Sequence, residues 1–172
     1  MKATLAVINQ MRADGVIGRY AIGGAVAATF YLEPSATLDI DVFVSLKTDH
    51  ASPLLTLGPI YEYLAARGCQ TQGEYVIIEG WQVQFLPPGY ALGEEALAQA
   101  IETRVDDVPT RVMTAEHLVA LALQLSRPKD FTRILQFVEA GVLDPNKLDL
   151  ILARHGLLAK WEKFGDRFLR KL

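Results

Sequence analysis

Asp39 and Asp41 are the residues whose types and spacing point most directly to chemistry. They flank Ile40 in the segment 38–45, which is rich in β-forming residues and predicts a strand. Because side chains alternate across a strand, both carboxylates share one face, about 6.6–6.8 Å apart at the backbone. Like charges on one face repel unless a cation lies between them, and Mg²⁺ (or Mn²⁺) suits carboxylate and phosphate oxygens. The alternative is two solvated acids at a strand edge.

The glycine pair Gly23-Gly24 is a second candidate element. It lies between a predicted short strand at 19–22 and a predicted small-residue helix at 25–32. Two glycines let another group approach the backbone closely, and the N–H groups at a helix start favour a phosphate. A plain turn explains the glycines equally well. Together, however, a phosphate-binding turn and a metal-binding strand supply the positioning and charge neutralisation that phosphoryl or nucleotidyl transfer needs.

Segments 20–27 and 37–44 together resemble the signature of the nucleotidyltransferase superfamily, and are most similar to its small AbiEii-like branch. This branch is related to bacterial toxins and minimal nucleotidyltransferases, and the resemblance covers roughly residues 3–140. It implies an α/β (α+β) fold with a short mixed β-sheet flanked by helices and a C-terminal helical tail. It also implies Mg²⁺-dependent transfer of a nucleotide from a nucleoside triphosphate.

The resemblance assigns roles to individual residues. Gly23 and Gly24 match the phosphate-binding glycines, and Asp39 and Asp41 match the metal-binding pair. The serine that usually follows the glycines is replaced by Ala25.

A charged segment further along the chain, Arg127-Pro128-Lys129-Asp130, resembles the Arg-x-Lys-Asp motif of the AbiEii-like group. Arg127 and Lys129 would neutralise the triphosphate, and Asp130 would orient it or cap a helix. The alternative is an ordinary charged first turn. More broadly, a group of basic residues could gather on one side of the molecule and attract phosphate, although their default role is a solvated face: Arg104, Arg111, Arg127, Lys129 and Arg133.

The chain departs from the family pattern at three positions. Gln84 stands where the superfamily usually has a third carboxylate, Ala122 replaces a lysine, and Arg133 replaces an aspartate. A neutral amide can coordinate Mg²⁺ through its oxygen but cannot serve as a general base. Glu74 or Glu79 are candidate substitutes. Catalysis could therefore be slow, use another base, or be lost with nucleotide binding retained.

The elements that must position these residues follow from periodicity, caps and breakers. The sequence predicts a mixed α/β part over 1–113 and an all-helical part over 114–172, which we treat as one structural unit. Thr114 and Asp144 are predicted helix caps. The remaining expected elements are helices at 3–13, 53–66, 93–101, 114–125, 128–140 and 157–171, a further helix that begins at 144–145, strands at 74–79 and 81–86, and a strand within 104–113 that ends at Val112-Met113.

Composition limits the class of protein. The 172 residues are 51% hydrophobic and 22% charged, which permits a true core. A net charge of −3 offers no broad footprint for nucleic acid. The single Cys69 forms no internal disulfide and fits a reducing compartment. Because no apolar run approaches the roughly 20 residues of a membrane span, we expect a soluble cytoplasmic protein without a membrane partner.

Three functional hypotheses remain at this stage. The first is an enzyme that moves a nucleoside monophosphate from a nucleoside triphosphate to an unknown acceptor, which could be RNA, protein or a small molecule. The second is a catalytically degenerate nucleotide-binding module, motivated by Gln84, Ala122 and Arg133. The third is a toxin–antitoxin-type interaction protein with an antitoxin-like partner or a second copy of itself.

Overall fold

The central feature of the fold is one mixed sheet. The computed structural model describes residues 1–34, 37, 39–46 and 56–169. Within them, seven strands are arranged in the order β3-β4-β5-β2-β1-β7-β6. The strands are β1 (Tyr20–Ile22), β2 (Asp39–Val44), β3 (Gln70–Gln72), β4 (Tyr75–Ile78), β5 (Trp81–Leu86), β6 (Ile101–Val105) and β7 (Val108–Val112). The central strand β2 runs antiparallel to β1 and parallel to β5.

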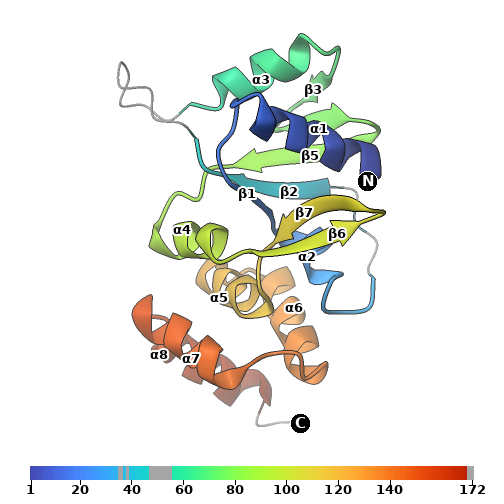
Figure 1. Cartoon of the computed structure of the whole chain (residues 1–172). Helices are drawn as coiled ribbons and strands as arrows, with labels where there is room; N and C mark the ends of the chain where they lie inside the picture. Colours follow the sequence, from blue (N-terminus) through green and yellow to red (C-terminus); the bar gives the residue numbers. More distant parts are fainter. Residues whose placement is uncertain (35–36, 38, 47–55, 170–172) are drawn as a thin grey trace.

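Helices cover both sides of this sheet. In Figure 1, α1 and α3 lie above the strands, and α5 to α8 lie below them, with α7 and α8 farthest from the sheet. The helices are α1 (Lys2–Ala13), α2 (Gly24–Ala28), α3 (Gly58–Ala65), α4 (Ala91–Ala98), α5 (Ala115–Leu125), α6 (Pro128–Glu139), α7 (Pro145–Arg154), α8 (Leu158–Phe164) and the π-helical turn η1 (Gly165–Leu169). No helix in the described ranges is long and apolar enough to cross a bilayer. The predicted fold class, a mixed sheet flanked by helices with a helical C-terminal part, is confirmed.

Alternation along β2 separates the core from the site. Ile40, Val42 and Val44 are fully buried, whereas Asp39 and Asp41 are only partly covered on the other face. The buried face belongs to the same core as α1, whose inward residues include Leu5, Ile8 and Met11 at helical spacing. The core therefore holds the strand rigidly and leaves its two carboxylates free to face a cleft.

The C-terminal helices begin where the sequence predicted. Thr114 caps α5 by accepting a hydrogen bond from the His117 backbone N–H, and Asp144 caps α7 in the same way. Helix α5 contacts α2, α4, α6 and α7. It thus connects the helical part to α2 and α4 of the α/β part.

Several elements differ from the prediction. The strand expected within 104–113 is β7, which ends at Val112, and β6 precedes it in a hairpin that was not predicted, because Asp106 and Asp107 both adopt positive φ and form a tight turn. The expected helix at 93–101 ends at Ala98, and β6 begins at Ile101. The edge strand β3 was missed, since its residues are all exposed and carry no apolar alternation.

Other elements differ only at their ends. The helix expected at 25–32 comprises Gly24–Ala28, and the Thr29 hydroxyl, which donates to the Val26 carbonyl oxygen, follows its last turn. The final helix expected at 157–171 is divided into α8 and η1 at Gly165. For the helix expected at 53–66, residues 53–55 lie outside the described ranges, as does residue 38 of the strand expected at 38–45.

Candidate active site

The two carboxylates on β2 lie on one face of the strand, as alternation predicted. Asp41 is paired in register with Gln84 of β5, and Asp39 with Gln82. The Asp39 Oδ1 atom also accepts a hydrogen bond of 3.0 Å from the Thr37 hydroxyl. Backbone pairing on both sides of β2 fixes the strand, so the separation of the carboxylates is set by the sheet.

The glycine turn packs directly against Asp41. The Gly23 N–H donates to the Asp41 carbonyl oxygen at 2.9 Å. Gly24 has φ +57°, and a Cβ atom there would lie 1.8 Å from the Asp41 Oδ2 atom. A Cβ on Gly23 would lie 2.6 Å from the ring of Phe43. Any side chain at either position would therefore collide with β2, and the backbone approaches the carboxylate as closely as glycine allows.

Gly24, Asp41 and Phe43 line a cleft of about 540 Å³ between the strands and the C-terminal helices. One wall carries Asp39, Asp41 and Glu74. The opposite wall comes from the start of α6 and carries the predicted residues Arg127, Lys129 and Asp130, together with Arg133. The tertiary structure thus brings Asp39 and Asp41 together with Arg127, Lys129 and Asp130, some ninety positions further along the chain, whereas Arg104 and Arg111 do not line this cleft.

Charge in the cleft is divided between the walls. Burial raises the pKa of Asp41, and the nearby negative charge of Asp39 raises it further. The positive charges of Lys129, Arg127 and Arg133 oppose these effects but do not cancel them. Asp41 is therefore a carboxylate whose negative charge lacks full compensation from the protein.

This donor set fits a hard divalent cation that is shared with a substrate. Within the described ranges, no three His, Cys, Asp or Glu side chains come close enough together to hold a metal alone. Mg²⁺ commonly takes one or two carboxylates and completes its shell with water and substrate phosphates. The uncompensated charge of Asp41 beside Asp39 would attract such a cation, and the cleft would leave room for a phosphate group.

The position of the expected third carboxylate is occupied by Gln84, as the sequence indicated. Its Nε2 donates a hydrogen bond of 2.9 Å to the Oε2 atom of Glu74. Glu74 precedes β4 and lines the same cleft, whereas Glu79 is not among the lining residues. Gln84 therefore ties a carboxylate from the neighbouring hairpin to the strand beside Asp41.

Asp130 and Arg127 form a tight pair at the start of α6. The Arg127 Nε and Nη2 atoms donate to the two Asp130 carboxylate oxygens at 2.8 and 3.0 Å, and the Arg127 backbone N–H donates to Oδ2 at 2.9 Å. Burial raises the pKa of Asp130, but the hydrogen bonds from Arg127 outweigh it and hold the pKa below its ordinary value. Asp130 thus caps the helix and orients the Arg127 guanidinium. Lys129 and Arg133 have no such carboxylate partner among the ion pairs of the described residues.

Sequence reasoning missed two aromatic residues of the cleft, Tyr75 and Tyr90. Tyr90 is 44% exposed and immediately precedes α4, after the break at Pro87-Pro88-Gly89. The sequence indicates the break, but no residue pattern around Tyr90 predicts that its side chain lines the cleft. Ala122 of α5 also lines it, and its small side chain leaves space where the family pattern has a lysine.

Comparison with known proteins supports the fold and leaves the finer assignment open. No protein-family model matches the chain, and no curated protein matches it. Among solved structures, the antigenic nucleotidyltransferase-like protein from Paracoccidioides brasiliensis is similar to it, with 15% identity and a TM-score of 0.57 over 89% of this chain and 85% of that one. The chain therefore has the fold of nucleotidyltransferase-like proteins.

Two further similar structures belong to the antibiotic-resistance factor ANT(2'')-Ia. Its solution structure is 16% identical, with a TM-score of 0.52 over 97% of this chain and 100% of that one. Its crystal structure in complex with adenylyl-2''-tobramycin is 14% identical, with a TM-score of 0.51 over 91% and 98%. The AbiEii-like branch and a toxin–antitoxin partner stay predictions.

Proposed function

We propose that this protein is a metal-dependent nucleotidyltransferase that moves a nucleoside monophosphate from a nucleoside triphosphate to an acceptor hydroxyl. One observation carries the proposal: Asp39 and Asp41 share a face of β2, and the Asp41 carboxylate packs against Gly24 in the space that a Cβ would fill. That arrangement faces the basic wall of α6 across the cleft. It supplies negative ligands on one side and phosphate-binding charge on the other.

Each residue has a distinct part in this proposal. Gly23 and Gly24 let the triphosphate approach the backbone, and Lys129 and Arg133 neutralise its negative charge. Asp130 fixes the direction of the Arg127 guanidinium. Bound Mg²⁺, held by the two β2 carboxylates, would neutralise charge on the phosphate oxygens.

Glu74 is the residue we assign to proton removal. The acceptor oxygen forms a bond to the α-phosphorus, the bond from that phosphorus to the bridging oxygen breaks, and pyrophosphate leaves. The hydroxyl proton passes to a base, and Gln84 cannot accept it. Glu74 lines the cleft, and the hydrogen bond from Gln84 positions its carboxylate there.

The acceptor class is the least defined part of the proposal. ANT(2'')-Ia, which has a similar fold, has been crystallised with adenylyl-2''-tobramycin, an adenylylated small molecule. This likeness is consistent with a small hydroxylated acceptor, so small molecules come first in a screen that also includes RNA and protein.

Calorimetry with ATP, GTP and CTP in the presence of Mg²⁺ tests nucleotide binding. The Asp39→Asn/Asp41→Asn variant should bind at least about 100-fold more weakly, because losing both charged ligands costs several kcal/mol. The matched control is Asp106→Asn/Asp107→Asn, which removes the same charge from the β6–β7 turn, where asparagine accepts the positive φ. Equal heats for the wild type and the cleft variant would refute the proposal.

The nucleotide-binding module without catalysis is the second candidate, and Gln84 in register with Asp41 favours it. A transfer assay with α-labelled triphosphates separates the two functions. If Glu74 is the base, Glu74→Gln binds nucleotide normally but transfers at least about 100-fold more slowly. Binding by the wild type with no transfer to any acceptor would favour the module.

A further inference from the structure

A second, smaller cavity lies on the opposite face of the sheet. Its volume is about 260 Å³, it is open to solvent, and it is lined by residues of α1, β1 and the β6–β7 hairpin. Tyr20, which lines it, is paired with Val44 across β1 and β2. Val44 is on the face of β2 opposite Asp39 and Asp41, so the sheet separates this cavity from the cleft. The residues that line the two cavities are different.

The floor of this cavity is polar and fixed. The Tyr20 side chain is almost fully buried, and its hydroxyl lies 2.7 Å from the Asn9 Oδ1 atom and 3.4 Å from the Thr110 Oγ1 atom. The Asn9 Nδ2 atom donates to the Pro109 carbonyl oxygen at 2.8 Å. α1, β1 and β7 thus each contribute a hydrogen-bonded polar side chain at the edge of the core, where apolar side chains would be usual.

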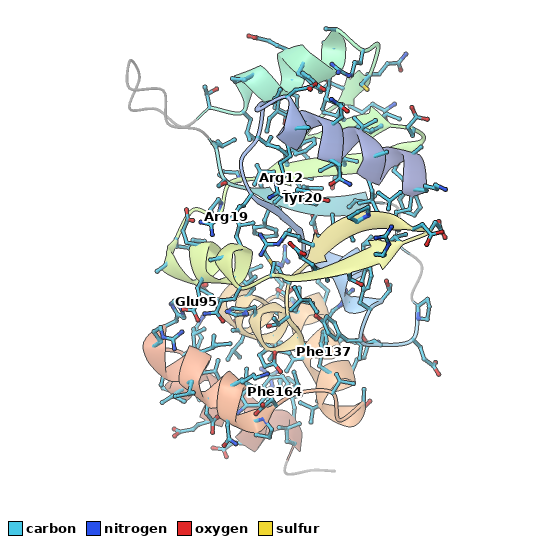
Figure 2. The ribbon with its side chains drawn as sticks, viewed as in Figure 1. Arg12, Arg19, Tyr20, Glu95, Phe137 and Phe164 are labelled. Atoms are coloured by element: carbon cyan, nitrogen blue, oxygen red, sulfur yellow. The ribbon has the colours of Figure 1, made fainter. Side chains whose placement is uncertain are left out.

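Three arginines line the same pocket. Arg12 comes from α1, Arg104 from β6 and Arg111 from β7, and Glu102 is the acid that also lines the cavity. Across the described part of the chain, none of the three guanidinium groups lies within 4.0 Å of a carboxylate. Their positive charge is therefore not neutralised by ion pairs. Figure 2 places Arg12 close to Tyr20, with Arg19 away from both.

Two of these arginines are oriented by carbonyl groups. The Arg111 Nη2 atom donates to the Ala100 carbonyl oxygen at 2.7 Å, and the Arg104 Nη2 atom donates to the Asp107 carbonyl oxygen. The Arg111 Nε atom is buried and has no hydrogen-bond partner in the described residues. Neutral carbonyls hold a guanidinium in place without cancelling its charge, and each arginine keeps further donors.

We propose that this cavity, the arginine pocket formed by Arg12, Arg104 and Arg111 over Tyr20, binds a small phosphate-class oxyanion. Arginine forks match the geometry of phosphate oxygens. The volume is below the range of about 300–1,000 Å³ that is usual for drug-sized ligands, which fits a small anion. Inorganic phosphate, pyrophosphate and a small phosphomonoester share this chemistry. The charge of Arg12 and Arg111 reaches the floor, since both oppose the rise in the pKa of Tyr20 that burial causes.

Amide chemical-shift mapping of the wild-type protein locates the binding site. The titrants are inorganic phosphate, pyrophosphate and glycerol phosphate, without divalent metal, and sulfate or chloride at equal ionic strength serves as reference. We expect saturable shifts at Thr103 and Thr110, and the tightest titrant identifies the source of the anion. Shifts confined to Gly24 and Arg127, responses equal to those of the reference salts, or no saturation would each overturn the proposal.

Charge-matched variants provide the second readout. Arg12→Gln/Arg104→Gln should weaken anion binding at least tenfold, because two of the three guanidinium groups are lost. The control Lys2→Gln/Arg19→Gln removes the same charge from exposed positions outside the pocket and should bind normally. Equal affinity of both variants would contradict the proposal.

The arginine pocket does not depend on the proposed transferase activity. The Asp39→Asn/Asp41→Asn protein should keep its anion binding and lose nucleotide binding, so the two proposals can fail separately.

Discussion

Gly24 illustrates how one absent side chain shapes the cleft. Its backbone has φ +57°, and Asp41 Oδ2 occupies the position of its missing Cβ. Gly68, at the end of α3, has a similar φ of +78° but nothing within 4 Å of its Cβ position. Backbone strain on substitution is therefore common to both positions, whereas crowding at the Asp41 carboxylate occurs only at Gly24.

Gly24→Ala is predicted to be far more damaging than Gly68→Ala. Both substitutions incur the left-handed penalty of about 1–2 kcal/mol, but only the first must also displace Asp41. Chemical denaturation should give a larger loss of unfolding free energy for Gly24→Ala, and calorimetry should show a loss of Mg²⁺-dependent nucleotide binding for it alone. Similar losses for the two variants would show that crowding at Asp41 does not matter.

Asp41 itself is predicted to reduce stability in the absence of metal. Its pKa is raised in the folded state, first by burial and then by Asp39, so the fold disfavours the ionised form at neutral pH. This penalty is absent below the ordinary pKa of the group and grows as the pH rises through it. Asp41→Asn should therefore melt a few degrees higher than the wild type in EDTA at pH 7, and Asp106→Asn should not. A lower melting temperature for Asp41→Asn would contradict this electrostatic account.

At the scale of elements, Glu95 links α4 to the C-terminal helices. Its carboxylate accepts from His155 at 2.8 Å and also binds Arg154, both at the end of α7. His117 of α5 lies 3.5 Å away and is fully buried. In Figure 2, Glu95 lies at the side of the molecule where α4 faces these helices. One carboxylate therefore joins three helices.

Acid should weaken this junction in a defined pH range. Burial raises the pKa of Glu95, but hydrogen bonds from Arg154 and His155 outweigh it and lower the pKa to about 2. Stability from Glu95 is complete above its ordinary pKa of about 4.5 and is lost as the pH falls from there towards 2. Burial also lowers the pKa of His117, so acid destabilises that neutral imidazole as well, from below pH 6.5.

Urea unfolding between pH 7 and pH 2.5 tests the contribution of Glu95. Glu95→Gln should cost about 1–3 kcal/mol at pH 7, because charge-assisted hydrogen bonds are weakened, and should flatten the pH dependence below 4.5. Glu94→Gln, at the exposed neighbouring position of α4, should change neither. An unchanged acid limb in Glu95→Gln would exclude this residue as the cause.

At the scale of the whole molecule, the cleft is built from both parts of the chain. Asp39 and Asp41 come from the strands, and Arg127, Lys129 and Arg133 from the helical part. Their relative placement depends on the packing of α5 against α2 and α4. A site of this kind requires that the two parts fold and unfold together.

The two tryptophans report on the two parts separately. Trp81 lies in β5, and Trp161 lies in α8, stacked on Phe164 with 5.5 Å between ring centroids. In Trp161→Phe and Trp81→Phe proteins, the fluorescence of the remaining tryptophan should follow one urea transition with the same midpoint as far-UV circular dichroism. An earlier transition of Trp161 would show that residues 114–172 unfold independently.

The sequence by itself determined the local geometry of the candidate site. Alternation in a strand puts Asp39 and Asp41 on one face, and the glycine pair marks a close backbone approach. The helix caps Thr114 and Asp144 were also predicted from the sequence alone. These features depend on residues within a few positions of one another, where chain geometry leaves few alternatives.

Only the tertiary structure decided which distant residues meet. Arg127, Lys129 and Arg133 line the cleft with the carboxylates, whereas Arg104 and Arg111, which the sequence allowed to gather with them, line the arginine pocket across the sheet. The left-handed turn of the β6–β7 hairpin and the register of β5 set these positions. Strand pairing and helix packing join residues far apart in sequence, and local periodicity carries no information about such contacts.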